Sequence, residues 1–418
     1  MDNFIHISER KNEYLHGSSV DYENKNKTSD INSAIQQHIT KNEDNHFLLV
    51  DLGEITGQYE KWVLNLPRII PHYAIKCNPS SAIIETLHSL GCHFDAASRN
   101  EIQQLLNLGV SPSKIVYANP CKSAEYIKYA KHNGVSLLVA DSPEELKKIH
   151  LYYPECHILI RIKTDDTKSL MGFNGKFGVA VDEIQPLFEL SKTLGLHISG
   201  VSFHVGSGCQ DENVYETAII NCRRVFDIAR EKCGINTLCI IDIGGGFPGI
   251  SSANPDAVSF EKIAVVINHS IDRYFYDMPE IQYIAEPGRY FVASSHTLIC
   301  EIINKKEIIV PETNEKRFIY YINDGIYGTF SGVMFDYFEF EIILYKREPM
   351  DNDNKKYNSI IFGPSCDSLD RITRGDVLLP KMSIGDIIVV RNIGAYSTAS
   401  ACEFNGFPRP SVKYIYGQ

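Results

Sequence analysis

The feature that most constrains the fold is a series of eight short apolar runs, each ending near a polar residue. The candidate strands end near Lys76, Asp95, Asn119, Asp141, Arg161, His204, Asp242 and Glu286. Amphipathic stretches with apolar residues at helical spacing lie between them, for example residues 101–108 and 124–131. Eight such units over roughly 240 residues are what a (β/α)8 barrel of the TIM type requires, so the sequence predicts an α/β barrel.

The first of these runs ends at Lys76. A lysine directly after a buried strand is expected to lose hydration, which lowers its pKa from ~10.4 and lets the amine form a Schiff base. A lysine in this position is more commonly a solvated loop residue, so the run alone predicts little. In a barrel, however, all strands end at the catalytic face, and charged or imidazole side chains end strand after strand here. This convergence favours Lys76 as a nucleophile.

The chain divides by pattern into three segments. Residues 1–45 are polar, and we expect little regular structure there apart from one strand that joins the β domain. Residues 46–290 carry the barrel pattern, beginning with an introductory apolar run, Phe47–Asp51. In residues 291–418 the helical patterns stop and short strand-like runs follow. This last segment predicts a C-terminal antiparallel β domain with a sandwich or barrel-like form.

The composition narrows the choice of partner and compartment. A net charge of -11 over 418 residues argues against nucleic acids and anionic membranes, which require a basic surface. The eleven cysteines show no C-x-x-C pair and no metal-ligand spacing, so we expect no metal site and a reducing, cytoplasmic environment. No apolar run approaches the ~20 residues that cross a bilayer, and residues 1–11 lack the apolar core of a signal peptide. We therefore expect a small-molecule substrate.

Two neighbouring loops predict a phosphate site. Gly244, Gly245 and Gly246 follow the seventh candidate strand, and Arg289 follows the eighth. Barrels bind phosphate in these loops, because glycine backbone can turn its N–H groups onto an oxyanion and arginine adds positive charge. A triple glycine alone is more commonly a tight turn. Arg289 in the next loop favours the phosphate interpretation.

His204 ends the sixth candidate strand and precedes Ser207, which lies between two glycines. Such a histidine is more commonly structural, but the glycines indicate backbone that approaches a ligand, and an imidazole can stack on a flat cofactor ring. A lysine able to form an imine, a phosphate site on the same rim and the carboxylate of Glu286 together predict pyridoxal 5'-phosphate. A carboxylate beside the pyridine nitrogen keeps it protonated, which makes the ring an electron sink for a carbanion at the substrate Cα.

A series of motifs carries a family resemblance. In chain order these are Tyr73–Asn78, Phe94–Asp95, Ala97–Ser98, His204–Gly208, Gly244–Gly249, Glu286–Tyr290, Asn323–Gly328, Gly363–Asp367 and Phe404–Phe407. From Phe47 to Tyr414 the chain resembles the eukaryotic-type ornithine decarboxylases, which are pyridoxal-phosphate enzymes with an alanine-racemase-like fold. The resemblance implies decarboxylation of L-ornithine to putrescine, the first step of polyamine biosynthesis.

For the barrel, the resemblance implies cofactor-binding roles that agree with those argued from the residues. Lys76 would hold the cofactor covalently, His204 would stack on its ring, and Glu286 would pair with the pyridine nitrogen. The residues implied to hold the phosphate are Ser207, Gly244, Gly245, Gly246, Arg289 and Tyr396. The residues implied to form a polar wall around Lys76 and the ring are Asp95, Glu101 and Arg161.

For the β domain, the resemblance implies the substrate side of the site. Cys366 would be the general acid that returns a proton to Cα, and Asp336 and Asp367 would receive the distal ammonium of the substrate. Tyr327 and Phe404 would complete this side. Without the resemblance, Cys366 would be interpreted as a buried apolar residue and the two aspartates as turn residues. In this family the site is shared, so the resemblance also implies a homodimer in which the β-domain residues reach the Lys76 barrel of the second subunit.

Several alternatives stay open at this point. Ser368 and Phe335 depart from the residues usual in the family, which leaves the substrate preference and the sensitivity to inhibitors undecided. Lysine or arginine could be the preferred substrate, since one methylene changes discrimination by only ~1–3 kcal/mol. A non-catalytic protein resembling the antizyme inhibitors is a second alternative, against which the retained cofactor residues argue. Antizyme is a candidate partner, and the sequence leaves open whether residues 122–151 bind it.

Overall fold

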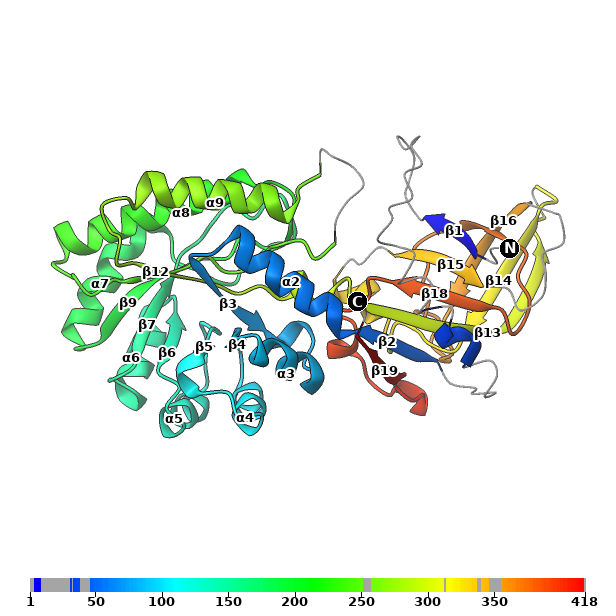
Figure 1. Ribbon diagram of the computed structural model, residues 1–418, viewed down its shortest axis with the longest axis horizontal. Helices are drawn as coiled ribbons and strands as arrows, with labels where there is room; N and C mark the ends of the chain where they lie inside the picture. The colour runs from blue at the N-terminus through cyan, green and yellow to red at the C-terminus, as the bar shows by residue number, and fades with distance from the viewer. Residues whose placement is uncertain are drawn as a thin grey trace. The chain divides into compact units, whose positions relative to one another are not determined.

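The computed structural model describes residues 4–8, 31, 33–37, 46–173, 175–250, 257–311, 313–336, 340–345 and 355–416. The chain divides into two compact units (Figure 1). Residues 55–291 form the first, which we call the barrel unit, and residues 1–54 with 292–418 form the second, the β unit. The chain passes from one unit to the other within the first turn of helix α2 (Leu52–Asn65) and again at the end of the short helix α10 (Arg289–Val292).

Within the described residues of the barrel unit, eight parallel strands close into a barrel. They are β3 (Ile69–Ala74), β4 (His93–Ala96), β5 (Ile115–Tyr117), β6 (Leu137–Ala140), β7 (His157–Arg161), β9 (His197–Ser202), β11 (Ile240–Asp242) and β12 (Gln282–Ala285). Each ends within two residues of the position expected from the sequence, so the predicted barrel is confirmed. The carboxyl ends of parallel strands open on one face, which brings the polar strand-end residues together.

Helices connect these strands and surround the barrel (Figure 1). After α2 they are α3 (Ser81–Ser89), α4 (Arg99–Asn107), α5 (Ala124–His132), α6 (Pro143–Tyr152), α7 (Ile184–Thr193), α8 (Asn213–Asp227) and α9 (Phe260–Tyr274). Serine caps define where four of them begin: the hydroxyls of Ser98, Ser123, Ser142 and Ser259 each accept from a backbone N–H one turn into the helix. Buried residues such as Ile102 and Leu105 of α4 lie three apart, so one face of the helix packs inward.

A small antiparallel ribbon lies in the barrel unit outside the barrel strands. It pairs β8 (Ser169–Met171) with β10 (Ser207–Cys209). Both strands have three residues, too few to show a periodic pattern in the sequence, and the sequence did not predict them. The ribbon joins the loop after β7 to the segment that carries Ser207.

The β unit contains a nine-stranded sheet in its described residues. The strands are β1 (Phe4–Ser8), β2 (Phe47–Asp51), β13 (His296–Ile309), β14 (Lys316–Ile322), β15 (Glu341–Tyr345), β16 (Lys356–Phe362), β17 (Val377–Pro380), β18 (Ile387–Arg391) and β19 (Ser411–Ile415). This confirms the predicted C-terminal β domain. Most neighbours are antiparallel, but β14–β16 and β2–β19 are parallel, because these pairs are joined by long connections rather than hairpins.

The run Phe47–Asp51 differs in placement from the sequence expectation, which put it at the start of the barrel segment. It forms β2 and pairs with β13 and β19 of the β unit. All five of its residues are buried, and a short continuous apolar run has the same appearance in a barrel strand as in a covered sheet. Phe4–Ser8 forms β1 and pairs with β15, whereas most of the polar segment 1–45 lies outside the described residues.

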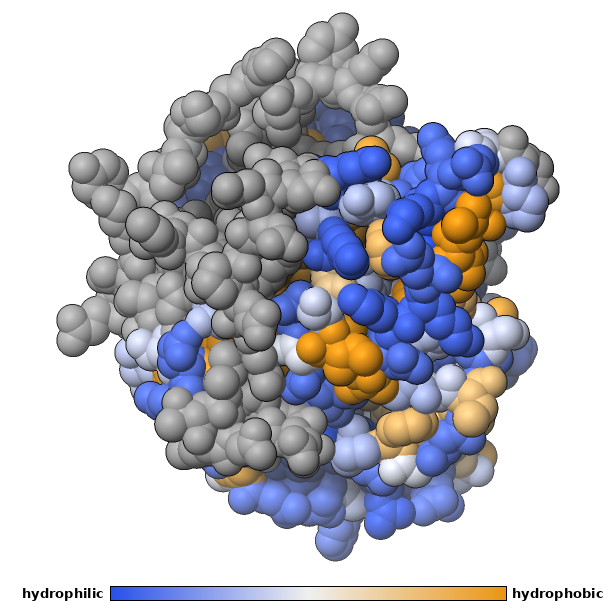
Figure 2. All heavy atoms as spheres, turned by 90° about the vertical axis from the view of Figure 1, so that its right-hand side faces the viewer, coloured by the Kyte–Doolittle hydropathy of each residue, from blue (hydrophilic) through white to orange (hydrophobic). Residues whose placement is uncertain are grey.

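The surface of the β unit is mixed in polarity. Figure 2 shows separate apolar patches among hydrophilic residues on the visible face. In the part of the chain that the structure describes, no helix combines the length and apolar character needed to cross a membrane.

Candidate active site

Lys76 lies on a short helical turn, Ile75–Cys77, that follows β3 at the mouth of the barrel. Its flanking residues Ile75 and Cys77 are buried, but the Lys76 side chain is 40% exposed. The Nζ atom forms an ion pair with Asp95, which is fully buried at the end of β4. Lys76 is therefore less buried than the sequence predicts, because its neighbours on the turn, rather than Lys76 itself, are the buried side chains.

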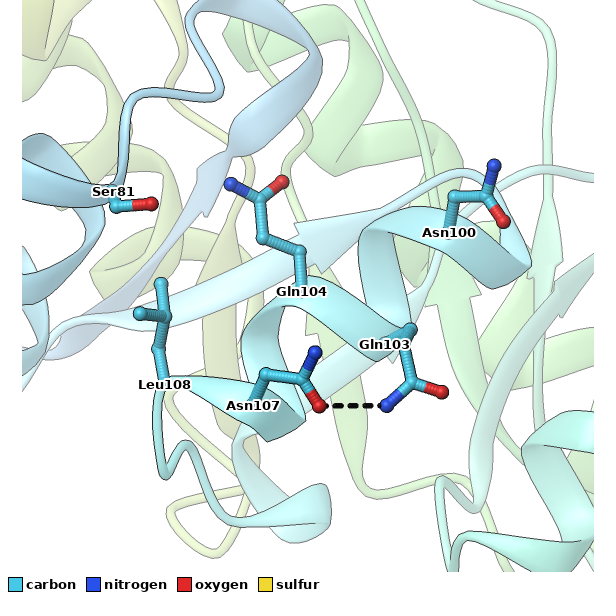
Figure 3. Close-up of a pocket in the computed structure, with 6 residues that line it drawn as sticks. All are labelled: Ser81, Asn100, Gln103, Gln104, Asn107 and Leu108. Carbon is cyan, nitrogen blue, oxygen red and sulfur yellow. Dashed lines mark hydrogen bonds between the residues drawn. The ribbon is translucent and has the colours of Figure 1, made fainter.

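The backbone after Lys76 is held by three polar contacts. The Tyr73 hydroxyl donates to the carbonyl of Asn78 at 2.9 Å, and the Asn78 side chain accepts from the Ser80 N–H at 3.2 Å. Gln104 of α4 donates its Nε2 to the carbonyl of Pro79 at 2.7 Å. Gln104 also lines a surface pocket of about 350 Å³ that Figure 3 shows between the start of α3 and α4. None of the residues lining this pocket is a predicted site residue.

Two acids at the ends of β11 and β12 form a coupled pair. Asp242 is fully buried and accepts from the Ser202 hydroxyl and the Gly244 N–H, both at 2.9 Å. Burial raises the pKa of Asp242 to about 6, and a hydrogen bond from Glu286 opposes this rise. Burial, together with the charges of Asp242 and Asp95, raises the pKa of Glu286 well above its usual value. Glu286 therefore carries the shared proton, and its Oε1 atom has no hydrogen-bond partner among the described residues.

His204 is held as a neutral imidazole beside the glycine loop. Its Nδ1 accepts from the Gly206 N–H at 3.0 Å, which leaves the ring proton on Nε2. Burial and the nearby charges of Arg161 and Lys76 lower the pKa of His204 well below its usual value. A Cβ atom on Gly245 would lie 2.8 Å from His204 Nε2, so only glycine leaves room for the ring.

The residues predicted to bind phosphate lie in the barrel unit, except Tyr396, which belongs to the β unit. The Arg289 Nη2 donates to the Ser207 hydroxyl at 3.0 Å, across 82 positions of sequence. Gly244 and Gly246 have φ of 63° and 106°, a region that favours glycine. A Cβ on Gly244 would lie 2.0 Å from the carbonyl oxygen of Phe203, so the loop approaches its neighbours too closely for any side chain.

Glu101 and Arg161 complete the set of predicted site residues in the barrel unit. We call this set the barrel cluster, and its members are Lys76, Asp95, Glu101, Arg161, His204, Ser207, Gly244, Gly245, Gly246, Glu286 and Arg289. Glu101 accepts from the Ala97 N–H while its own N–H donates to Ser98, so it helps to begin α4. Burial raises the pKa of Glu101, and the charges of Asp95 and Lys76 also act on it. Arg161 ends β7 and acts electrostatically on His204. The structure thus brings every barrel residue predicted for the site to one mouth.

The β unit carries a second cluster, which we call the loop cluster: Tyr327, Cys366, Asp367 and Phe404. The Tyr327 hydroxyl donates to Asp367, and its ring stacks on Phe404 with centroids 4.3 Å apart. The Leu369 N–H and the Tyr327 hydroxyl lower the pKa of Asp367. Cys366 is exposed, so its interpretation as a buried apolar residue is wrong.

Sequence reasoning missed Asn405, which supports the loop cluster. Its Oδ1 accepts from the Cys366 N–H at 3.0 Å and ties the Cys366 loop to the segment carrying Phe404. Its φ of 53° lies in the left-handed region, which asparagine tolerates better than most residues. The Asn-Gly pair at 405–406 is a turn signal that could have identified it.

Asp336 and Tyr396 lie on other parts of the β unit. Asp336 is buried and follows the short helix α11 (Ser331–Phe335), whose last residue, Phe335, is 65% exposed. Tyr396 has a φ of 51° in the loop after β18. The Ser331 hydroxyl donates to the carbonyl of Ser397 at 2.6 Å, which connects α11 to the Tyr396 loop. Ser368 is exposed and lies two residues after Cys366.

Comparison with known proteins decides the family. Residues 52–293 match the family model described as the pyridoxal-binding domain of pyridoxal-dependent decarboxylases. The chain belongs to this family. Rat ornithine decarboxylase is 41% identical over 393 residues, covering 92% of this chain and 84% of the relative. Antizyme inhibitor 2 of Xenopus laevis is 41% identical over 392 residues, with the same two coverages.

A solved structure shares both parts of the fold. The arginine decarboxylase of Paramecium bursaria Chlorella virus is 32% identical, with a TM-score of 0.84 over 93% of this chain and 100% of that one. The decarboxylase fold therefore extends through the β unit, beyond the residues that the family model matches.

The pyridoxal phosphate of this decarboxylase family fits the barrel cluster. Glu286 Oε1 is buried without a hydrogen-bond donor among the described residues, which leaves this oxygen available to pair with the ring nitrogen of the cofactor. The glycines at 244 and 245 leave backbone rather than side chains at the mouth, and Arg289 adds a cation beside Ser207. No group of three or more His, Cys, Asp or Glu side chains in the described ranges could hold a metal ion.

Proposed function

We propose that this decarboxylase converts L-ornithine to putrescine and carbon dioxide. The observation that carries the proposal is the loop cluster, where Asp367 has a lowered pKa beside the exposed Cys366. A carboxylate that stays ionised suits the distal ammonium of a basic amino acid and rejects a neutral or acidic tail. The similarity to rat ornithine decarboxylase over most of the chain supports ornithine among the basic amino acids.

In this proposal the barrel cluster holds the cofactor. Lys76 would bind it covalently, Glu286 would pair with the ring nitrogen, and His204 would cover one face of the ring. The phosphate would lie on Ser207, Arg289, Tyr396 and the backbone of residues 244–246. When bound, pyridoxal phosphate supplies an electron sink for the electron pair left at Cα by departing carbon dioxide.

The side chains of the barrel mouth prepare for this binding. Asp95 orients the Lys76 amine through their ion pair. Glu286 carries a proton in the apoprotein, and it would pair with the ring nitrogen of the bound cofactor. His204 stays neutral, so it adds no positive charge that would compete with the ring for Glu286.

The loop cluster would bind the substrate and finish the reaction. Asp367 and Asp336 receive the distal ammonium, and Tyr327 fixes the Asp367 carboxylate through its hydroxyl. Cys366 donates its thiol proton to Cα after carbon dioxide leaves, which produces the amine product. Phe404 stacks on Tyr327 and keeps that ring in place.

The proposal includes a homodimer with shared active sites. Phe335, Leu369 and Phe404 are 65%, 62% and 40% exposed, and Leu369 and Phe404 belong to the loops that carry or contact Cys366. Exposed apolar side chains such as these suit a surface that a second copy covers. Light scattering at micromolar concentration tests the dimer, and a monomer with full activity would contradict it.

The substrate assignment is tested by comparing kcat/KM for L-ornithine, L-lysine and L-arginine. We expect ornithine to give the highest value. A higher value for lysine or arginine would overturn the ornithine assignment but leave the decarboxylase in place. That outcome is relevant because a similar solved structure is named an arginine decarboxylase.

The relative named antizyme inhibitor 2 supports a second candidate, a non-catalytic protein that binds antizyme. Purified protein that has no cofactor absorbance and is not trapped by borohydride would favour it. Binding to antizyme is a separate question, which a pull-down with purified antizyme would answer.

We place the protein in the cytoplasm because all eleven cysteines lie in described residues and none forms a disulfide.

A further inference from the structure

The loop after β7 carries two phenylalanines that the proposed function does not use. The Phe173 ring stands nearly perpendicular to the His204 imidazole, at 86°, with centroids 5.0 Å apart. The Arg161 guanidinium lies over the Phe177 ring, 5.0 Å from its centroid. Both contacted side chains belong to the barrel cluster. One loop therefore touches two residues predicted to face the cofactor.

The two rings project from a single turn. The N–H groups of Lys176 and Phe177 both donate to the carbonyl of Phe173, at 2.9 and 3.0 Å. One short backbone segment therefore positions both rings, one against His204 and the other against Arg161.

Both ends of this turn are anchored by half-buried carboxylates. Asp166 accepts from the Phe173 N–H, and a Cβ on Gly172 would lie 3.0 Å from the Asp166 Oδ2. At the other end, Asp141 Oδ2 accepts from the Gly178 N–H at 2.7 Å. Asp141 follows β6 at the barrel mouth and has no proposed role in cofactor binding. Its contact with this turn gives that strand-end acid a structural role.

The same loop packs onto the segment that carries His204 and Ser207. β8 pairs with β10, so Met171 lies opposite Ser207. The Ser169 hydroxyl donates to the carbonyl of Val205 at 2.6 Å. A Cβ on Gly206 would lie 2.5 Å from the Ser169 Cβ, so the close approach requires glycine. The loop is therefore seated against the segment it contacts rather than extended into solvent.

We propose that Phe173 and Phe177 form an aromatic clamp that fixes the orientations of His204 and Arg161 for cofactor binding. The inference rests on the proposed function, since it assigns these two rings as positioning residues of the same site. Without Phe173, the imidazole is held in its plane by the Gly206 N–H but can tilt about that bond. Without Phe177, the guanidinium loses the ring that supports it.

The test titrates pyridoxal phosphate into apoprotein carrying Phe173→Leu or Phe177→Leu and records the visible circular dichroism of the bound cofactor. We expect each variant to bind about 2- to 10-fold more weakly, the range that one aromatic contact supports, and to change the cofactor band. Phe173→Tyr and Phe177→Tyr keep an aromatic ring at each position, and these variants should bind pyridoxal phosphate with an affinity within about 2-fold of the parent. The apoprotein Tm reports folding separately.

The matched control is Lys168→Ala, in the same loop, which removes an exposed ion pair to Asp211 and leaves both rings in place. It should keep the parent affinity and cofactor band. Parent-like binding by both leucine variants, or an equal loss in Lys168→Ala, would overturn the clamp. If a leucine variant does not fold, Asp166→Asn is the alternative test of the clamp. That variant weakens the anchor of the turn with both rings present, and it should also alter the cofactor band.

Cofactor binding is measured without ornithine, which separates the two proposals. Parent protein that binds pyridoxal phosphate but leaves ornithine intact would contradict the proposed function and leave the clamp standing. Parent protein that decarboxylates ornithine, with leucine variants indistinguishable from it, would contradict the clamp alone.

Discussion

The barrel cluster and the loop cluster differ in the burial of their ionisable side chains and in the direction in which the pKa values of their acids are shifted. In the barrel, Asp95 and Asp242 are 0% exposed, and the pKa values of Asp242 and Glu286 are raised by burial. In the β unit, Cys366 is exposed and hydrogen bonds lower the pKa of Asp367. A buried group of acids with too little positive charge is prepared for a resident cation, such as a protonated cofactor ring. A half-buried, ionised carboxylate such as Asp367 suits a charged substrate that enters and leaves.

Lys76→Ala should have the largest effect, because it removes the amine proposed to hold the cofactor. We expect a fall in kcat of roughly 10⁴-fold or more, the scale seen when a covalent catalytic group is lost. Absorbance of the purified protein and a coupled assay for carbon dioxide measure both consequences. Lys168→Ala, an exposed lysine of the same unit, should stay active. A Lys76→Ala protein with parent-like activity would remove the barrel cluster from the chemistry.

Cys366→Ala should impair the second half of the reaction only. We expect kcat to fall by roughly 10³-fold, within the range for a general acid, while cofactor and ornithine binding are retained. Product analysis should show incorrect protonation at Cα. Cys239→Ala changes another exposed cysteine and serves as the control. Clean release of putrescine at the parent rate would show that the thiol is not the acid.

Glu286→Gln tests whether the reaction requires a carboxylate at position 286. A neutral amide cannot stabilise a protonated ring nitrogen, so kcat should fall by roughly 10²-fold, as for loss of one electrostatic contact in a site. Asp386→Asn is a suitable control, since Asp386 is another buried acid and lies in the β unit. That variant should alter Tm but not the cofactor absorbance. Equal kcat for Glu286→Gln and the parent would contradict the pairing with the ring.

Tyr327→Phe should have a smaller effect, confined to the substrate side. Loss of the hydroxyl frees the Asp367 carboxylate to rotate, so we expect KM for ornithine to rise roughly 10-fold with little change in kcat. Tyr414→Phe changes an exposed tyrosine on β19 and should leave KM unaltered. A change in kcat at constant KM would place Tyr327 in the chemical step instead.

The smallest effect concerns the stability of the apoprotein. The pKa of Asp242 is raised from 3.8 to about 6, so its contribution is most favourable at low pH and is lost as the pH rises through about 6. Asp242→Asn removes this loss. Its Tm relative to the parent should therefore increase as the pH is raised from 4 toward 7, as measured by calorimetry. A constant difference in Tm across this range would show that the acid pair does not titrate as described.

The sequence predicted the barrel well because its signals are local. Each strand is a short apolar run, and a polar residue such as Asp95 or Glu286 marks its end, so neighbours in sequence carry the information. The side chains at the mouth then followed from one general rule, that barrel strands end at the catalytic face. The exposure of Lys76 was not predicted, because it depends on a three-residue turn rather than on the strand.

The loop cluster was predicted only through the family resemblance. Tyr327, Cys366 and Phe404 lie on loops far apart in sequence, and no local pattern places a tyrosine hydroxyl on Asp367. The contacts of Phe173 and Phe177 were not predicted for the same reason, since the sequence does not indicate which side chain an aromatic residue in a loop contacts. Long-range contacts between irregular segments are set by tertiary packing, which a single sequence does not display.

The most direct test of a reaction divided between the two clusters mixes inactive Lys76→Ala with inactive Cys366→Ala protein. If each site takes its barrel cluster from one subunit and its loop cluster from the other, some mixed dimers contain one complete site. We expect up to about a quarter of the parent activity to return after random exchange of subunits. A mixture that exchanges subunits, as shown by differently tagged copies, yet stays as inactive as its components would contradict the shared site.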